Sequence, residues 1–306
     1  MDNHPKKKIV VTGATGSQGG AAARHLLARG FAVSAFTRHP EKAAAHLLAR
    51  KGAEVFQGNL DDPQSVATAL RGAYGVFVVL DFWTQGYDKE IQQGITLIDA
   101  AKAARVRHFV YSSVASADAD TGLPHFESKR RIERLLQGSG LEYNVLRPVF
   151  FMDNFSANRE DILEGHFKSA LPAARKLQMI AVDDIGRFAA EVFERPQAFP
   201  RILEIAGAEL TMPQAAEVFS ETLGRPVQFE EVPLDMLAAR NPEAGAMYAW
   251  FRDKGYTVDV QGMRARFPWL KTFGEWARAA GWETESERGA APHGPISHSQ
   301  SPTVTG

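Results

Sequence analysis

An apolar, β-branched run that ends in three spaced glycines constrains the fold of this chain more than any other segment. Residues 9–20 read Ile-Val-Val-Thr-Gly-Ala-Thr-Gly-Ser-Gln-Gly-Gly, and an alanine- and leucine-rich helical pattern follows at once. The order of strand, tight turn and helix places a helix N-terminus against a pyrophosphate. The turn therefore predicts a dinucleotide site, and a tight turn without a ligand is the alternative.

Each glycine of this turn has an expected role. Gly13 permits the turn, Gly16 lets the backbone approach the phosphates, and Gly19 lets the helix pack closely on the strand. The residues that we expect to hold the dinucleotide here are Gly13, Thr15, Gly16, Ser17, Gln18 and Gly19.

Strand-like and helix-like segments alternate through the first half of the chain. Strand patterns occur at 8–12, 32–37, 53–57, 75–80, 108–112 and 142–146, and helical patterns at 17–29, 41–51, 63–71, 88–104 and 125–138. Units of this spacing require parallel pairing and right-handed crossovers. The expected fold class is therefore α/β, with a Rossmann-type doubly wound parallel sheet and a smaller, mainly helical C-terminal lobe.

Differences in composition between successive segments divide the chain further. We expect residues 1–150 to form the dinucleotide-binding domain and residues 181–206 to return to it, with a strand at 202–205. Residues 151–180 are aromatic and irregular, residues 207–282 have a helical pattern, and together they form the expected small lobe for a substrate or partner. Residues 283–306 are poor in apolar side chains, which predicts a disordered tail.

Composition excludes several classes of function. The formal net charge is −1, so the chain lacks the basic field that would attract nucleic acid or an anionic membrane. The chain has no cysteine, and its nine histidines show no metal-ligand spacing, so we expect no metal site. No apolar run approaches about 18 residues, which suggests a soluble, cytoplasmic protein. A symmetric homodimer is the default if the chain forms an oligomer.

The end of the second strand indicates which dinucleotide binds. Proteins that bind NAD place an acidic residue there to hold the ribose 2′-hydroxyl, whereas this chain has Arg38, with Lys42 shortly after it. A guanidinium grips phosphate oxygens bidentately, so the pattern favours the 2′-phosphate of NADP(H). A solvated basic face is the alternative. Asn59 and Leu60 follow the third strand, where the adenine edge lies, although Asn is also a common turn former.

Several segments match one family in order and spacing. They are Gly13–Gly20, Thr37-Arg38, Gly58–Asp62, Asp81–Trp83, Val110–Ser113, Pro124–Lys129 and Leu146–Phe155. Over residues 8–282 the chain resembles the short-chain dehydrogenase/reductase superfamily, and within it the atypical NmrA-like branch of HSCARG-like redox sensors and related reductases. The resemblance implies NADP(H) as cofactor and either a regulated protein or a small aromatic substrate as partner.

The same resemblance locates the expected chemistry. Active members of the superfamily carry Tyr-x-x-x-Lys on one helix face, where Lys holds the nicotinamide ribose and lowers the pKa of the Tyr. Here the matching step is His125 and Lys129. His125 is either a general acid–base or a polar contact near the nicotinamide. Ser113 occupies the position of the family's serine, although serines at a strand end also make turns.

Two further segments follow strand ends. Asp81 and Phe82 come after the fourth strand and either line the cofactor cleft or form an apolar loop under the lobe. Phe150 and Asn154 follow the sixth strand, where the Asn154 amide could bond a carboxamide. Packing between the lobes is the alternative for the aromatic residues of that run.

Two functions follow from these interpretations. The first is an NADP(H)-binding redox sensor or regulator with weak or no dehydrogenase activity of the usual kind, favoured by the intact phosphate turn and the missing tyrosine. The second is an NAD(P)H-dependent reductase of a flat apolar substrate such as a quinone, for which proximity and orientation can suffice. A structural relic without a ligand conflicts with the complete glycine set.

Overall fold

The computed structural model describes residues 6–282, so the expected disordered tail at 283–306 lies outside the described residues. Its main feature is a seven-stranded sheet in which every neighbouring pair is parallel. The spatial order is β10 (Ile202–Ile205), β6 (Tyr143–Pro148), β5 (His108–Ser112), β4 (Gly75–Val78), β1 (Lys8–Val11), β2 (Ala32–Thr37) and β3 (Glu54–Gln57). The α/β, doubly wound fold class is thereby confirmed.

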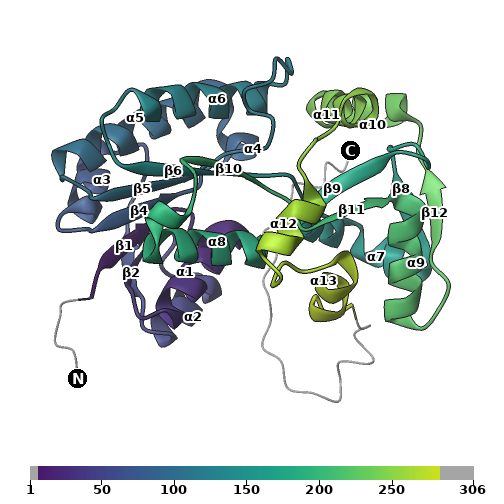
Figure 1. Cartoon of the computed structure of the whole chain (residues 1–306), viewed down its shortest axis with the longest axis horizontal. Coiled ribbons are helices and arrows are strands. Elements are labelled where there is room, and N and C mark those ends of the chain that lie inside the picture. Colours follow the sequence, from purple (N-terminus) through teal and green to yellow (C-terminus); the bar gives the residue numbers. More distant parts are fainter. Residues whose placement is uncertain (1–5, 283–306) are drawn as a thin grey trace.

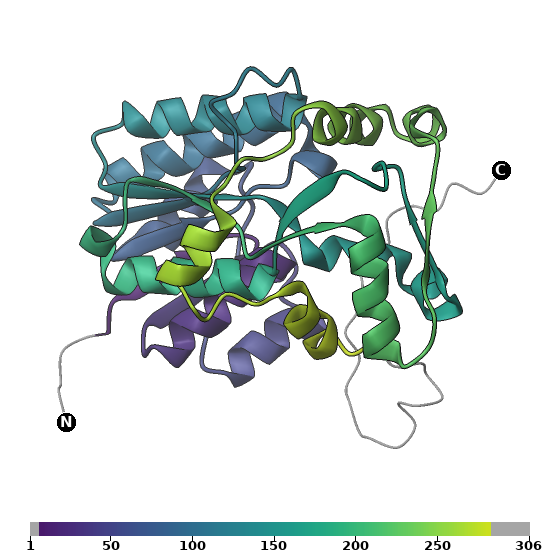
Figure 2. The ribbon, with the colours of Figure 1, turned by 45° about the vertical axis from the view of Figure 1, so that its right-hand side comes forward.

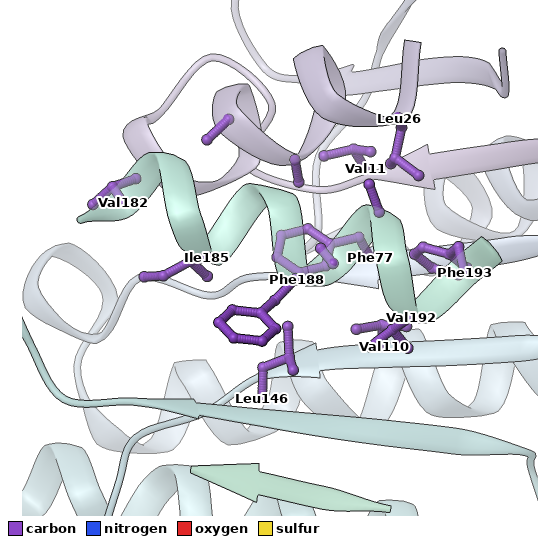
Figure 3. Close-up of a cluster of buried hydrophobic side chains, with 14 of the residues drawn as sticks. Val11, Leu26, Phe77, Val110, Leu146, Val182, Ile185, Phe188, Val192 and Phe193 are labelled. Atoms are coloured by element: carbon purple, nitrogen blue, oxygen red, sulfur yellow. The ribbon is translucent and has the colours of Figure 1, made fainter. Parts of the chain in front are cut away.

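Helices cover both faces of the sheet (Figure 1). One face carries α1 (Ser17–Ala28), α2 (Ala43–Arg50) and α8 (Val182–Glu194), and the other carries α3 (Pro63–Leu70), α5 (Tyr87–Ala103) and α6 (Pro124–Gln137). Figure 3 shows the apolar cluster under α8, in which Phe188 and Phe193 meet Leu26 of α1 and strand residues such as Val110. The crossover that ends in β10 thus returns the chain to the sheet.

Capping residues and glycines explain where helices begin and end. Asp62 caps α3, because its Oδ1 accepts a hydrogen bond of 3.0 Å from the backbone N–H of Gln64, and Pro63 occupies the first helical position. Gly30, with φ +81°, follows the end of α1. Residues of this kind separate the helices from the strands. Because the strands of the large sheet are all parallel, their carboxyl ends lie at one edge of it.

The small lobe contains more strands than its sequence pattern indicated. Its first part, expected to be irregular, contains β7 (Phe150–Phe151), a 3-10 helix (Met152–Asn158), α7 (Arg159–Glu164), β8 (His166–Ser169) and β9 (Lys176–Ile180). Its second part contains β11 (Ala208–Thr211), α9 (Met212–Leu223), β12 (Gln228–Glu231), α10 (Leu234–Arg240), α11 (Pro242–Asp253), α12 (Val260–Arg266) and α13 (Phe273–Ala279). The strands form two small sheets, β11-β9-β7 and β12-β8.

The boundary between the two parts of the molecule is crossed by α12. This helix falls in the range expected for the small lobe, yet it lies against α8 of the dinucleotide-binding domain (Figure 2). The ring of Phe267, just after α12, lies 4.9 Å from that of Phe188, and Met263 belongs to the same buried cluster. The segment therefore fastens the small lobe to the larger domain.

Candidate functional site

The glycine turn between β1 and α1 has the shape of an anion cradle. Gly13 has φ +57°, a conformation that L side chains rarely adopt, and a Cβ on Gly19 would overlap the Gly13 carbonyl oxygen. Helix α1 begins at Ser17 with Gly16 as its N-cap, and no side chain caps it. The backbone N–H groups of its first turn are therefore available to phosphate oxygens.

The polar side chains of the turn are tied to neighbouring strands. The Ser112 hydroxyl, at the end of β5, donates a hydrogen bond of 2.7 Å to Oε1 of Gln18. The hydroxyls of Thr15 and Thr37 lie 3.2 Å apart, which links the turn to the end of β2. Ser17 is exposed at the helix start. These contacts fix the turn at the carboxyl edge of the sheet.

Arg38 and Lys42 follow β2 and are both exposed. Within residues 6–282, neither side chain forms an ion pair of 4 Å or less, whereas the neighbouring His39 is 3.1 Å from Glu41. Lys42 occupies the N-cap position of α2. Two unpaired cations beside the phosphate turn suit a 2′-phosphate, which a guanidinium can grip with two hydrogen bonds.

A pocket lies beyond these cations, between the start of α3 and one side of α5. Its lining residues are Leu60, Asp61, Pro63, Lys89, Gln92, Gln93 and Thr96. The Asp61 carboxylate accepts a hydrogen bond of 2.7 Å from Gln93 and pairs with Lys89 at 2.8 Å, and both contacts lower its pKa. Asn59 bends the loop instead, because its Oδ1 accepts from the backbone N–H of Asp61 at 3.1 Å. Leu60 lines this pocket, and its role at the adenine stays a prediction.

On the other side of the turn, a short helix carries the residues that follow β4. Asp81 caps α4 (Phe82–Gln85), because its Oδ1 accepts a hydrogen bond of 3.4 Å from the backbone N–H of Thr84, and its Oδ2 also accepts one of 2.6 Å from the Thr84 hydroxyl. The Phe82 ring is buried 5.7 Å from His125, and Trp83 lies 5.0 Å from the same imidazole with 54% of its surface exposed. Phe82 therefore lies beside His125, the expected catalytic residue, whereas the Asp81 carboxylate is used to cap α4.

His125 itself is almost enclosed by rings. It is 7% exposed, with Phe126 4.8 Å away, and its Nδ1 is buried without a hydrogen-bond partner in the described structure. Burial, together with the positive charge of Lys129, lowers the pKa of His125 to about 4. At neutral pH the imidazole is uncharged, so it offers one N–H donor and one lone pair but no excess proton.

Lys129 has a partner that the sequence analysis missed. Its Nζ lies 2.5 Å from Oε1 of Glu90, a completely buried carboxylate on α5, and the Ser128 hydroxyl donates to the other carboxylate oxygen. A signal for Glu90 was present in the sequence, because it shares the buried stripe of α5 with Gly94, Leu97 and Ile98. A carboxylate among apolar positions predicts a buried ionic partner.

The remaining expected site residues differ in their surroundings. Ser113 follows β5 and has a buried hydroxyl oxygen that lacks a partner among the described residues. Phe150 is 8% exposed and packs against Phe155 and Phe251 inside the small lobe. Asn154 is exposed on the 3-10 helix. Ser113, like His125, thus carries a buried polar atom without a partner among the described residues, whereas the Phe150 ring belongs to the core of the lobe.

The residues present fit a dinucleotide across this edge. The lack of a Cβ on Gly19 lets α1 pack directly on the Gly13 carbonyl, the first turn of α1 has no side-chain cap, and His125 and Ser113 carry buried polar atoms without partners among the described residues. Among residues 6–282, no cluster of three or more His, Asp or Glu side chains could hold a metal ion. Within the same range, no helix combines the length and apolar character needed to cross a membrane.

Comparison with known proteins assigns the chain to a family. A model of the NmrA-like family matches residues 5–270. The chain is 30% identical over 233 residues to an NAD(P)H azoreductase of Xenophilus azovorans, and the match covers 74% of this chain and 78% of the relative. The chain spans about half the length, 51% and 47%, of NmrA-like family domain-containing oxidoreductases of Cladobotryum and Aspergillus versicolor.

Two solved structures share the fold. The NADPH-dependent quinone oxidoreductase QOR2 of Escherichia coli, complexed with NADPH, superposes with a TM-score of 0.74 at 24% identity over 89% of this chain and 99% of that one. NmrA, a negative transcriptional regulator in complex with NADP, gives 0.75 at 21% identity over 91% and 99%. At this level of identity the likeness concerns the arrangement of the backbone.

Proposed function

The chain belongs to the NmrA-like family, and from that premise we propose that it binds NADP(H) and acts as a redox-responsive regulator without the usual dehydrogenase chemistry. The observation that carries the proposal is the uncapped N-terminus of α1 beside the unpaired Arg38. The glycine turn holds the pyrophosphate and Arg38 and Lys42 hold the 2′-phosphate. Bound NADPH supplies a hydride.

The surroundings of His125 and Lys129 support a regulator rather than a carbonyl reductase. Reduction of a carbonyl needs a proton donor at the oxygen, and the superfamily's tyrosine is replaced by His125. The low pKa of this imidazole leaves it neutral at physiological pH, so its N–H is a poor acid. Lys129 is held by Glu90. These residues can bind and orient a nicotinamide ribose without donating a proton.

A second candidate function is favoured by the aromatic wall next to His125. Trp83 is 54% exposed, and the Phe126 ring behind the imidazole lies 5.2 Å from Trp250 of α11. Such a surface suits a flat, uncharged acceptor that takes its protons from water. The azoreductase relative and the quinone oxidoreductase fold neighbour act on acceptors of this kind by their names. The second candidate is therefore a quinone- or azo-type reductase.

One experiment separates the two functions. The protein is titrated calorimetrically with NADP+, NADPH, NAD+ and NADH, and NADPH oxidation is then followed against a panel of quinones and azo dyes. Tight binding of NADP(H) without turnover supports the regulator, and sustained turnover with one acceptor supports the reductase. Failure to bind any of the four dinucleotides would contradict both.

A further inference from the structure

We propose that the buried ion pair between Glu90 and Lys129 determines how strongly the site distinguishes oxidised from reduced cofactor. This inference rests on the proposed binding of NADP(H) and deepens it, because a redox-responsive protein must respond to one form or to the ratio of both. Glu90 acts through Lys129 and does not itself reach the cofactor edge, since its side chain is 0% exposed.

The pair is rigidly built. The Lys129 ammonium lies 2.5 Å from Oε1 of Glu90 and is 15% exposed, while Ser128 donates to Oε2. Both carboxylate oxygens are therefore occupied, one by a cation and one by a neutral hydroxyl. The two charges cancel at a fixed place between α5 and α6, one helical turn from His125.

The topology places this pair near the nicotinamide end of a bound dinucleotide. The phosphate turn follows β1, and the residues expected at the 2′-phosphate and the adenine, Arg38 and Leu60, follow β2 and β3 on one side of it. A dinucleotide that lies across the carboxyl edge must extend to the other side, over β4 and β5. That side carries Phe82, Ser113 and the helix with Lys129.

Charge at this end affects the two forms of the cofactor unequally. The oxidised nicotinamide ring carries a positive charge and the reduced ring is neutral, so a net charge nearby changes the affinity for NADP+ much more than for NADPH. His125 is neutral because burial lowers its pKa to about 4. Glu133, one turn after Lys129, is paired with Arg147 at 2.7 Å. With Lys129 neutralised by Glu90, we expect affinities for NADP+ and NADPH within about tenfold of each other.

The decisive variant is Glu90→Gln, which keeps the shape of the side chain and leaves the Lys129 ammonium without a counter-charge. Calorimetric titration should then show the ratio Kd(NADP+)/Kd(NADPH) rising about tenfold over the parent protein, from repulsion of the oxidised ring. Ser128→Ala is the matched control, because it removes the other contact of Glu90 without changing any charge, and it should leave the ratio unchanged.

The double variant Glu90→Gln/Lys129→Gln separates charge from structure. It buries no unpaired charge, so its ratio should return to that of the parent although both affinities fall. If Glu90→Gln weakens both forms equally, Glu90 is a structural residue and the inference is wrong. A parent protein that favours either form by more than about a hundredfold overturns it without any variant. If the parent binds neither form, the proposed function fails instead.

Discussion

Gly186 of α8 lies so close to Ala21 of α1 that a Cβ on the glycine would sit 2.5 Å from the Ala21 carbonyl carbon. Both helices cover the same face of the sheet, and the glycine lets their backbones approach closely (Figure 1). Helix α1 carries the phosphate turn at its N-terminus, so this contact also holds the start of the site in place. The packing of α8 thus connects the returning segment of the chain to the cofactor turn.

Replacement of Gly186 by alanine should therefore destabilise the protein. The added methyl group meets backbone, which cannot move aside as a flexible side chain can, so we expect a loss of about 1–3 kcal/mol in the free energy of unfolding. Urea denaturation followed by circular dichroism measures it. Gly274→Ala in α13 is the control, because its Cβ would meet only side-chain atoms, the end of Arg278 at 3.4 Å and Cγ1 of Val218 at 3.7 Å, and it should be neutral or slightly stabilising. Equal stability of both variants would contradict the prediction.

Arg38 should determine the preference for NADP(H) over NAD(H). A charge-assisted bidentate contact is worth about 1.5–3 kcal/mol, so the parent preference should exceed about tenfold. Arg38→Asp should abolish or reverse it in calorimetric titrations with both cofactors. Arg71→Asp, an exposed charge reversal at the end of α3, is the control and should retain it. A parent protein with equal affinities would show that the 2′-phosphate is not recognised here.

The parts of the site that could be predicted from sequence are local. Gly13, Gly19 and Arg38 lie within or just after a single βα unit, and the chemistry of such a unit is legible from the order of its residues. The Glu90–Lys129 pair joins residues 39 positions apart on different helices, so its geometry depends on how α5 and α6 pack. The sequence carried only the weaker signal of a carboxylate within an apolar stripe.

The strands of the small lobe were missed for a related reason. β8 (His166–Ser169) and β12 (Gln228–Glu231) are four residues each and pair with one another across more than fifty residues of sequence. A run of this length is too short to show a reliable alternation of apolar and polar side chains. The large sheet was easier to predict because its strands are separated by helices that require parallel crossovers.

Arg147 should stabilise the fold rather than take part in chemistry. Its guanidinium holds the buried Glu133 carboxylate with hydrogen bonds of 3.0 and 2.7 Å, and Asp118 lies 3.1 Å away. Glu133→Gln removes one partner but leaves Asp118, so we expect a loss near the lower end of the range for buried pairs, about 3 kcal/mol. Glu142→Gln breaks the exposed pair with Arg201 and should cost less than about 1 kcal/mol. Equal losses in the free energy of unfolding for the two variants would refute the structural role of the Glu133–Arg147 pair.

His125 should make the stability of the protein depend on pH in the acidic range. Its pKa is about 4 in the folded protein and about 6.5 in an unfolded chain. Between these values the unfolded chain binds the proton and the folded protein does not, so the free energy of unfolding falls as the pH falls from 6.5 to 4. The contribution, up to about 3 kcal/mol, is fully present above pH 6.5.

The comparison that isolates this effect uses His125→Phe, which keeps an aromatic ring among Phe82, Trp83 and Phe126 but cannot titrate. Urea denaturation at several pH values between about 4 and 7 should show a smaller loss of stability in the variant than in the parent. His46→Gln, at an exposed position, should behave as the parent does. A variant with the parent's pH dependence would mean that His125 is already accessible to protons in the folded state.

The last prediction concerns turnover with any acceptor found in the quinone and azo panel. Because the imidazole of His125 is neutral at physiological pH, His125→Ala should change kcat only slightly, in contrast to the loss of about 10²–10⁴-fold expected when a general acid is removed. The parent's kcat should also be flat between about pH 6 and 8. His125→Gln, which keeps a polar contact without titrating, serves as the control for lost packing. A kcat that collapses in both variants and titrates near neutrality in the parent would identify His125 as the proton donor, and the reductase would then replace the regulator as the function of this site.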